Sequence, residues 1–552
     1  MSPDSKMHES MASQSQVPRQ NPYSQSLIVG GLLTLFIAAL ASLSVVTPLA
    51  VSSSASNLDY ESSFKSREEW LNLDNATRFD RDIRLTPLEL KTNAYLMKLR
   101  LEEGEALAKT SLFPPTLRFP VAKPIIEKTK LFEAIRTMPK GGYLHAHLEA
   151  LADIQWMIRS AVAYPTCHIK FDPVKYRTYS VNDTGSVLLA RFQFTSASLS
   201  SRDWVQCNVA RNAYPGGPTA FDTHLELTNT LIPDVYPTED IAWARFMLTF
   251  AMLGDLIRYQ PMFEQYITRF LHTSLDDGIT YAEIRISKWD NYDEASQVVP
   301  FRAVLDSVRR LVTAFKVSHP DFQDLKFVYQ DVRFNTHANI AASLKDAIAL
   351  RQSHASQIVG FDLVGHEVTA PLTNLVTLLK NGKRAAAQAG VDLPFMLHAG
   401  ETLRSGVAPD TNLVDALLLG SKRLGHAFSL AHHQGLIEKV RDMDVAVEVA
   451  VISNQMLGLV TDIRQHPVID LLLRGVQVAL ASDDPSVFGY EGVSFDFYQV
   501  YMSFESLDIA SLKKLSMNGI TYSGMTKKER AHAMRIFNKR WDAWIAVFAA
   551  QG

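Results

Sequence analysis

The chain has 552 residues, of which 47% are hydrophobic and 20% are charged, and its formal net charge is −3. This composition is typical of a globular protein and excludes a mostly disordered or fibrous chain. The charge balance lacks the basic excess of a nucleic-acid-binding protein. Two cysteines exclude a disulfide-rich scaffold and a metal site built from cysteine alone. The length allows several domains of about 150 residues, or one α/β barrel of about 250 residues with additions.

The N-terminal part of the sequence predicts entry into the secretory pathway. Residues 20–58 carry no charge, and residues 27–51 are apolar apart from a few Ser, Thr, Gly and Pro. About 20 such residues suffice to cross a bilayer. We expect either a signal peptide, cleaved near Ser53-Ser54-Ala55, or a signal anchor. The first makes the protein secreted, and the second makes it a type II membrane protein whose remaining chain is lumenal or extracellular.

Two weaker features agree with that compartment. Cys167 and Cys207 are close enough in sequence to pair within one small module, and an oxidising compartment favours a disulfide between them. Asn75-Ala-Thr77 and Asn182-Asp-Thr184 match the N-glycosylation pattern. A glycoprotein with one disulfide is therefore expected.

Residues 59–130 are predicted to be a helical region. Thr86-Pro87-Leu88-Glu89 fits a capping box, with Thr at the N-cap, Pro at the first helical position and Glu three residues after the cap. Leu88, Tyr95 and Leu99 continue one helical face. Several prolines between residues 114 and 124 end this pattern before the next unit.

From residue 131 to the end, the sequence predicts a (β/α)₈ barrel of the TIM type. Strand-like runs, most of them separated by helical stretches, occur at residues 143–147, 280–286, 326–333, 359–364, 393–398, 423–426, 445–451 and 476–481. Strands that alternate with helices form a parallel sheet, and eight of them can close into a barrel. The gap after the first run is too long for one crossover helix. Residues about 160–225, which hold both cysteines, are predicted to be an inserted subdomain.

Histidines and carboxylates stand at the ends of four of these runs. The first run ends in His145-Ala-His147, whose alternating residues point to one side of a strand and can share a metal. The other runs end in His398-Ala-Gly-Glu401, in Gly425-His426 and in Asp483-Asp484. Each residue alone fits a structural role, such as a buried histidine or a helix cap. Together they lie at the barrel end where active sites form, which indicates one joint site.

The residue types predict the chemistry of that site. His145, His147, His398 and Asp483 form a nitrogen and oxygen set that suits zinc. Zinc lowers the pKa of a bound water toward ~7 and supplies hydroxide at neutral pH. The remaining Glu401, His426 and Asp484 are then the acid–base group, which handles the proton of the water and protonates the leaving side.

These residues resemble the adenosine deaminase family, and more closely its secreted growth-factor subfamily. The resemblance covers about residues 60–550 and includes the leading helical region and the insertion after the first strand. Its motifs are Met138-Pro-Lys-Gly-Gly-Tyr-Leu-His-Ala-His147, Gly360-Phe-Asp-Leu-Val-Gly-His-Glu367, His398-Ala-Gly-Glu401, Arg423-Leu-Gly-His426, Ile452-Ser-Asn-Gln455 and Ser482-Asp-Asp-Pro485.

The resemblance implies zinc-dependent hydrolytic deamination of adenosine at C6, which gives inosine and ammonia. His145, His147, His398 and Asp483 would hold one zinc ion per subunit. Glu401 would protonate purine N1, His426 would take or orient the water proton, Asp484 would bond N7, and the backbone N–H of Gly365 would meet N3. The subfamily also suggests a homodimer formed through the leading helices, and an insertion that binds a cell-surface partner.

Some positions depart from the family pattern. Glu149 stands where the classical enzymes have Asp in contact with a ribose hydroxyl, and adenine deaminases have Glu there. In the subfamily a Trp-x-x-Phe-Glu segment helps to bind the nucleoside; here Trp243 and Phe246 remain, but Met247 replaces Glu. Val332 stands where the subfamily has a histidine near the third strand. Trp243, Phe246 and Phe250 also fit plain helix packing.

Two alternative functions stay open. Glu149 is compatible with an aminohydrolase of adenine or a modified purine. The leader and the insertion are compatible with a receptor-binding, growth-factor-like protein whose barrel is vestigial, although the intact ligand and acid–base residues argue against it. A cytidine-type deaminase is excluded, because its H-x-E…P-C-x-x-C zinc signature is absent from the sequence.

Overall fold

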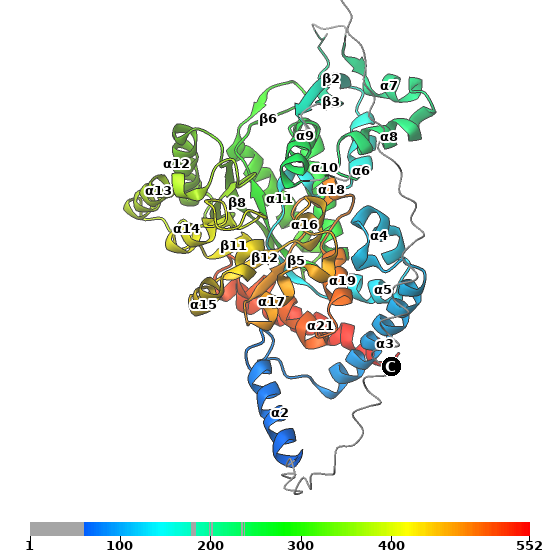
Figure 1. Ribbon diagram of the computed structural model, residues 1–552. Helices are drawn as coiled ribbons and strands as arrows, with labels where there is room; N and C mark the ends of the chain where they lie inside the picture. Colours follow the sequence, from blue (N-terminus) through cyan, green and yellow to red (C-terminus); the bar gives the residue numbers. More distant parts are fainter. Residues whose placement is uncertain are drawn as a thin grey trace, which may run out of the picture. The chain divides into compact units, whose positions relative to one another are not determined.

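The computed structural model describes residues 60–177, 184–197, 199, 203–232, 236 and 238–551 (Figure 1). The chain divides into two compact units, residues 1–72 and residues 73–552. Helix α2 (Tyr60–Asn75) contains the boundary, and everything below concerns the second unit. Among the described helices, none has the length and apolar character needed to span a bilayer. The predicted signal segment, residues 27–51, lies outside the described residues.

Eight parallel strands form the centre of the fold and confirm the predicted (β/α)₈ barrel. They are β1 (Gly141–Tyr143), β5 (Ile279–Ile286), β8 (Asp324–Val332), β9 (Ile358–Val364), β10 (Met396–Ala399), β11 (Arg423–His426), β12 (Ala446–Val449) and β13 (Val478–Leu480). They pair in the orders β1-β5-β8-β9 and β10-β11-β12-β13. Parallel bridges between Phe361 and Phe395, and between Ala146 and Asp483, join the two sheets at both edges.

Helices follow the strands and cover them on the outside, as α12, α13 and α15 do in Figure 1. They are α10 (Gln260–Asp276), α11 (Phe301–Ser318), α12 (His337–Ser353), α13 (Val376–Gln388), α14 (Asn412–Leu418), α15 (Gln434–Asp442), α16 (Val451–Met456), α17 (Val468–Leu473), α18 (Pro485–Phe488), α19 (Ser494–Ser503), α20 (Ile509–Thr521) and α21 (Lys527–Ala549). In α11, Val304, Val308 and Phe315 are buried on one face, which is the spacing of a helix that packs on a sheet.

The region before β1 is helical, as predicted. It contains α3 (Pro87–Lys109), α4 (Phe119–Ile126) and α5 (Lys130–Thr137). The predicted capping box is confirmed: Thr86 N donates to Glu89 Oε2 over 2.7 Å, and Glu89 N donates to Thr86 Oγ1 over 3.3 Å. Glu89 also accepts a hydrogen bond from the indole of Trp541 in α21, so the start of α3 is fixed against the C-terminal helix.

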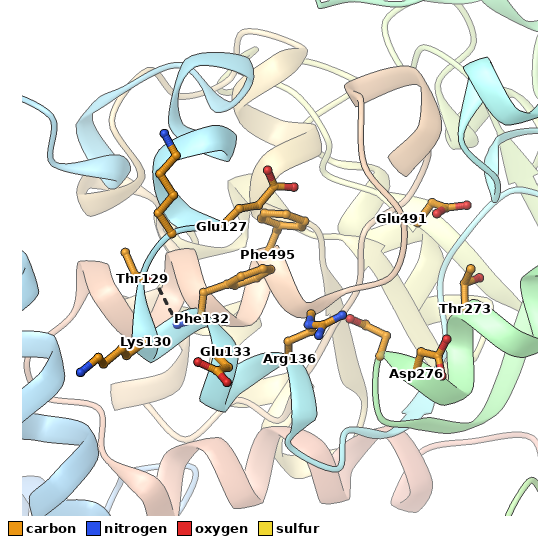
Figure 2. A pocket seen from close by; sticks show the side chains of 12 residues that line it. Glu127, Thr129, Lys130, Phe132, Glu133, Arg136, Thr273, Asp276, Glu491 and Phe495 are labelled. Carbon is orange, nitrogen blue, oxygen red and sulfur yellow. Dashed lines mark hydrogen bonds between the residues drawn. The ribbon is translucent and has the colours of Figure 1, made fainter.

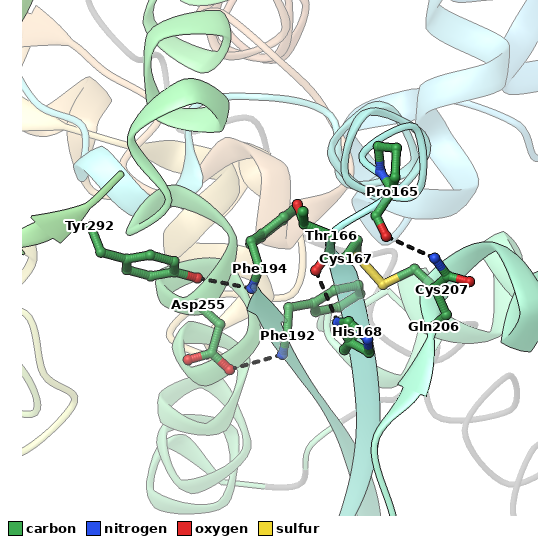
Figure 3. The surroundings of a disulfide bond; sticks show 10 residues. All are labelled: Pro165, Thr166, Cys167, His168, Phe192, Phe194, Gln206, Cys207, Asp255 and Tyr292. Carbon is green, nitrogen blue, oxygen red and sulfur yellow. Dashed lines mark hydrogen bonds between the residues drawn. A yellow bond between two sulfur atoms is a disulfide. The ribbon is translucent and has the colours of Figure 1, made fainter. Parts of the chain in front are cut away.

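The segment between β1 and β5 contains α6 (Ile154–Val162), β2 (Cys167–Arg177), β3 (Thr184–Phe194), β4 (Val205–Gln206), α7 (Cys207–Ala213), α8 (Gly217–Thr228) and α9 (Glu239–Ile257). The three strands form an antiparallel sheet in the order β3-β2-β4. The expected disulfide between Cys167 and Cys207 is present and joins the start of β2 to the start of α7 (Figure 3).

Backbone amides of β3 donate hydrogen bonds that fix this sheet to α9 and to the segment after β5 (Figure 3). Phe192 N donates to Asp255 Oδ2 of α9 over 3.2 Å, and Phe194 N donates to the hydroxyl of Tyr292 in β6 (Asn291–Tyr292) over 3.1 Å. Of the two glycosylation motifs, Asn75 is exposed at the end of α2, whereas Asn182 lies outside the described residues.

The boundary of the first strand differs from the prediction. The run was expected at residues 143–147, but β1 ends at Tyr143, so His145 and His147 follow the strand rather than end it. The chain stays extended there, because Ala146 bridges to Asp483 and His147 bridges to Arg285. The alternation that places both imidazoles on one side therefore persists beyond the regular strand.

Candidate active site

The four predicted metal ligands converge at the C-terminal ends of the strands. His145 and His147 follow β1, His398 lies in β10, and Asp483 follows β13. Their ligand atoms all lie within 4.8 Å of one another, and all four residues are buried. Asp483 Oδ1 lies 3.2 Å from His145 Nε2 and 3.1 Å from His147 Nε2. Residues from two strand ends about 340 positions apart thus share one point, as the barrel closure requires.

Each of the three histidines uses its Nδ1 atom in a hydrogen bond to a partner that the sequence analysis missed. His145 Nδ1 lies 2.8 Å from Glu448 Oε2, His147 Nδ1 lies 2.8 Å from Gln330 Oε1, and His398 Nδ1 lies 2.7 Å from Asp362 Oδ2. An Nδ1–H that donates to an oxygen leaves the lone pair on Nε2. The three Nε2 atoms are thereby prepared to bind a cation.

Arg285 in β5 links two of these partners. Its Nε donates to Asp362 Oδ2 over 3.0 Å, and its Nη2 donates to Glu448 Oε2 over 2.5 Å. Arg423 also pairs with Glu448 and, over 2.7 Å, with Glu283. All of these groups are fully or almost fully buried, so each carboxylate needs its cationic partner to remain charged.

The electrostatics favour a neutral His398 and charged Asp362 and Glu448. Burial lowers the pKa of His398 to about 4. Burial alone would raise the pKa of both Asp362 and Glu448. The pKa of Asp362 is nevertheless lowered, because His398 and Arg285 lie beside it. The pKa of Glu448 is lowered by Arg285 and Arg423. A neutral imidazole beside a carboxylate is the form in which both groups bind a metal.

The donor set fits a divalent cation such as zinc. His145 Nε2 and Asp483 Oδ1 are buried and have no hydrogen-bond partner within the described part of the chain. Buried polar atoms without a partner are costly, unless a ligand satisfies them. Three imidazole nitrogens and one carboxylate oxygen are a typical ligand set for zinc. The residues thus fit a metal ion.

Glu401 and His426 lie next to this cluster. His426 Nδ1 is 3.4 Å from Glu401 Oε1, and His426 Nε2 is 4.0 Å from Asp483 Oδ2. Burial raises the pKa of Glu401 well above its usual value, and the nearby Asp483 and Glu367 raise it further. This shift favours the protonated form of Glu401, which is the form that can donate a proton. Burial lowers the pKa of His426 well below its usual value, so its imidazole is neutral and can accept one.

Two of these positions have a left-handed backbone. The φ angle is +60° at His426 and +63° at Asp483, a region that side chains other than glycine rarely adopt. Such strain at the ends of two strands of one sheet is typical of a functional site. At Gly365, where φ is +96°, a Cβ atom would also lie 3.0 Å from the ring of Phe334, so glycine is required.

A cavity of about 160 Å³ opens beside the metal-ligating cluster. It is lined by His147, Glu149, Trp243, Phe246, Met247, Phe250, Ser287, Gln330, Val332, Val364, Gly365, His398, Glu401, Asp483 and Asp484. All predicted site residues are among these except His145 and His426. Those two rings lie against His398, at centroid distances of 4.6 and 5.0 Å. The structure therefore brings all eleven predicted residues into one region.

The aromatic residues of α9 both pack together and line the cavity. The rings of Trp243 and Phe246 are 5.2 Å apart, and those of Phe246 and Phe250 are 5.0 Å apart, edge to face in each pair. Trp243 also stacks on His366 at 5.2 Å. The stripe therefore packs as a helix face and at the same time borders the cavity.

Glu149 and Asp484 supply buried carboxylates to the same cavity. Burial raises the pKa of both, and for Asp484 the neighbouring Asp483 and Glu149 raise it further. Glu149 Oε2 and Asp484 Oδ1 have no hydrogen-bond partner among the described residues. Polar atoms of this kind can bind the polar edges of a small ligand.

A second pocket lies elsewhere and is built differently. Residues of α5, of the turn before it and of the end of α10 line it together with Glu491 and Phe495, and the lining mixes acidic, basic, polar and aromatic side chains (Figure 2). The hydrogen bond drawn there, from Phe132 N to Thr129 Oγ1, caps the start of α5. None of its lining residues belongs to the two metal-ligating clusters found in the described part of the chain.

Comparison with known proteins is consistent with this geometry. A family model described as "Adenosine deaminase" matches residues 224–538, and one described as "Adenosine/AMP deaminase N-terminal" matches residues 34–135. Adenosine deaminase 2 of Homo sapiens is 34% identical over 475 residues, which cover 85% of this chain and 90% of that protein. An adenosine deaminase of Phlebotomus duboscqi is 30% identical over 525 residues, which cover 93% and 97%.

Solved structures show the same fold. An adenine deaminase from Arthrobacter aurescens has a TM-score of 0.50 and 19% identity, with 73% of this chain and 98% of that chain covered. An N6-mAMP deaminase from Arabidopsis has a TM-score of 0.51 and 16% identity, with 74% and 99% covered. At these identities the likeness concerns the barrel and not the substrate.

Proposed function

Because the chain belongs to the adenosine deaminase family, we propose that this hydrolytic deaminase converts adenosine and 2′-deoxyadenosine to inosine and 2′-deoxyinosine, with release of ammonia. The observation that carries the proposal is the placement of Glu401 and His426 beside the cluster of His145, His147, His398 and Asp483. That arrangement supplies a proton donor and a proton acceptor next to a metal site.

We propose zinc as the metal, held by the three histidines and Asp483. When bound there, zinc makes a water molecule nucleophilic at neutral pH. Glu401, whose raised pKa favours the protonated form, gives its proton to purine N1 as water adds to C6, because protonation of N1 makes C6 electrophilic. His426 takes or orients the proton of the water, and this proton passes to the amino group, which leaves C6 as ammonia. The hydroxyl on C6 then loses its proton to Glu401, which restores the acid and leaves the carbonyl of inosine.

The remaining cavity residues would position the substrate. The raised pKa of Asp484 favours its protonated form, which can donate a hydrogen bond to N7, while the backbone N–H of Gly365 meets N3. Glu149 faces the ribose, and Trp243 and Phe246 close the cavity around it. Burial of these groups excludes water, which strengthens each of these polar contacts.

The proposal extends to the organisation and location of the chain. Residues 1–58 are a signal peptide or anchor, residues 59–130 a helical region that forms a homodimer, and residues 131–552 the deaminase barrel with its insertion. The protein is secreted and glycosylated, and the insertion binds a cell-surface partner. The disulfide and the exposed Asn75 support the oxidising compartment.

A second candidate function rests on Glu149. A glutamate at this place is compatible with adenine as substrate, because the free base leaves room beside a longer carboxylate.

Incubation of the metal-loaded protein with adenosine in ¹⁸O-labelled water tests the main proposal. We expect inosine that carries one ¹⁸O atom and an equal amount of ammonia. Hypoxanthine from adenine, without turnover of adenosine, would establish the alternative instead.

A further inference from the structure

Apart from His147 and His398, the ionisable side chains that line the cavity are all acidic. Glu149, Glu401, Asp483 and Asp484 contribute carboxyl groups, and no lysine or arginine is among the described residues that line it. A phosphate group carries −1.5 to −2 charges near neutral pH and would enter this space without a cationic partner. Buried charges without a partner are strongly unfavourable. The cavity is thus unsuited to nucleoside phosphates.

Few polar atoms remain for the sugar once the purine end occupies the metal-ligating cluster. Both polar atoms of the Gln330 amide already have partners. Its Oε1 lies 2.8 Å from His147 Nδ1, and its Nε2 donates to Ser287 Oγ over 3.2 Å. Away from the metal and acid–base residues, the buried atoms without a partner in the described lining are Glu149 Oε2 and Trp243 Nε1. Glu149 Oε2 can accept a hydrogen bond, and Trp243 Nε1 can donate one.

These two atoms make different demands on a sugar. The indole N–H of Trp243 needs only a lone pair, which a ring oxygen supplies as well as a hydroxyl does. The carboxylate of Glu149 needs a hydroxyl hydrogen, and the 2′ and 3′ hydroxyls, which sit on adjacent carbons, can both reach one carboxylate. Apart from the hydroxyl of Ser287, which already accepts a hydrogen bond from Gln330, no group in this part of the described lining requires a 5′ hydroxyl.

The rest of the wall is apolar. Met247 and Phe250 of α9, Val332 at the end of β8 and Val364 at the end of β9 line it. A hydroxyl held against these side chains loses its water partners and gains no other. A thioether or methyl group there instead gains burial, and sulfur also makes favourable contacts with aromatic rings such as Phe250.

Building on the proposed deaminase activity, we propose that the site selects uncharged adenine nucleosides with an apolar 5′ group. The substrate class is 5′-deoxyadenosine and its 5′-alkylthio derivatives, and Met247 and Val332 are the specificity-determining residues. Atoms balance as in the parent reaction: water adds to C6, ammonia leaves, and the 5′ substituent is unchanged.

The test compares kcat/KM of the metal-loaded enzyme for adenosine, 5′-deoxyadenosine, 5′-deoxy-5′-methylthioadenosine and adenosine 5′-phosphate. We expect the methylthio compound to match or exceed adenosine, and the phosphate to be at least ~100-fold poorer. A methylthio compound ~10-fold poorer than adenosine, or a phosphate that is turned over well, would overturn the inference while leaving the deaminase activity intact. Deamination of none of the four would overturn the proposed function itself.

Variants of the apolar wall test whether it causes the preference for an apolar 5′ group. Met247→Gln keeps the side-chain length and adds a hydrogen-bond donor and an acceptor. The kcat/KM for the methylthio compound, relative to that for adenosine, should therefore fall at least ~5-fold. Val332→Thr, which is nearly isosteric, should move the ratio in the same direction and serves if the first variant does not fold. Leu248→Gln, on the same helix but outside the cavity lining, should leave the ratio unchanged. An unchanged ratio in both wall variants contradicts the assignment.

Discussion

Arg285 Nε lies 3.0 Å from Asp362 Oδ2, and that oxygen lies 2.7 Å from Nδ1 of the metal-ligating His398. Arg285 on β5 thus contacts the carboxylate that holds the imidazole of His398, a proposed metal ligand on β10. Through Glu448, Arg285 also reaches His145. The metal-ligating cluster therefore depends on buried charges behind it as well as on its own four residues.

The first prediction concerns this outer layer. Asp362→Asn removes the charge that holds His398 and leaves Arg285 with one carboxylate fewer. We expect metal affinity, measured by competition with a chelator, to fall ~10–100-fold. Asp346→Asn, which removes an exposed ion pair with Lys288, should leave metal affinity unchanged. Equal affinity in the wild type and Asp362→Asn would show that the outer layer does not act on the metal.

The second prediction concerns the proton donor. Glu401→Gln keeps the shape but removes the acidic proton, so kcat should fall by ~10²–10⁴ with metal content unchanged. Because burial raises the pKa of Glu401, the wild type should lose activity as pH rises through that pKa. Residual activity of Glu401→Gln should lack this alkaline loss. Glu438→Gln, exposed on α15, is the matched control, and near-normal turnover by Glu401→Gln would refute its role.

The third prediction concerns the choice between nucleoside and free base. Glu149 Oε2 is buried without a partner among the described residues, and adenine cannot supply the missing hydroxyl. An unmet buried acceptor costs about 1–3 kcal/mol, so adenine should have a kcat/KM at least ~10-fold below that of adenosine. Glu149→Ala should shrink this advantage, and Glu149→Asp should largely preserve it. Equal turnover of both substrates by the wild type would favour the adenine alternative.

The fourth prediction concerns the disulfide. Cys167 and Cys207 close a loop with a sequence separation of 40 residues. In the chain-entropy model such a loop stabilises the folded state by about 4 kcal/mol. Replacement of both cysteines by alanine should lower the denaturation midpoint, with the metal site retained. Mass spectrometry of the unreduced wild type should find no free thiol, and two alkylatable thiols in the native protein would refute the pairing.

The fifth prediction concerns stability in acid. His466 is buried, its Nε2 lies 2.9 Å from Asn454 Oδ1, and burial lowers its pKa to about 3. The unfolded chain takes up this proton near pH 6.5, whereas the folded chain does not until about pH 3. The stability that His466 contributes is therefore present above pH 6.5 and is lost as pH falls through that window, at up to about 1.4 kcal/mol per pH unit.

Urea denaturation of the wild type and His466→Asn at several pH values measures this effect. The difference in unfolding free energy between them should narrow as pH falls from 6.5. The same comparison with His337→Asn, which changes an exposed histidine, should show no such narrowing. A wild-type advantage over His466→Asn that stays constant with pH would contradict the assignment.

The sequence predicts the barrel and the metal ligands because both leave local patterns. Alternation places His145 beside His147, and strand ends carry His398 and Asp483 to one face of the barrel. The Thr86 capping box is equally local. These features need only neighbours along the chain, and the structure agrees with each of them.

The layer behind the metal ligands leaves no such pattern. Asp362, Glu448 and Gln330 lie within buried strands, where one polar residue has no fixed spacing to the histidine it contacts. Their partners lie 36, 303 and 183 positions away. The cavity wall on α9 is likewise set by how the helix packs, which periodicity alone cannot reveal. The regular strand β1 ends at Tyr143, and beyond it only isolated bridges continue the pairing, from Ala146 to Asp483 and from His147 to Arg285.

Metal titration of adenosine turnover is the most direct test of the proposed function. The protein is stripped with a chelator, then zinc is returned in steps while the loss of adenosine absorbance and the release of ammonia are followed. We predict no activity in the stripped protein, and recovery that saturates at one zinc per chain. His147→Ala should bind zinc weakly and fail to recover, since His147 supplies one of the four ligand atoms. Full adenosine turnover without metal, or a zinc-loaded protein that leaves adenosine unchanged, would contradict it.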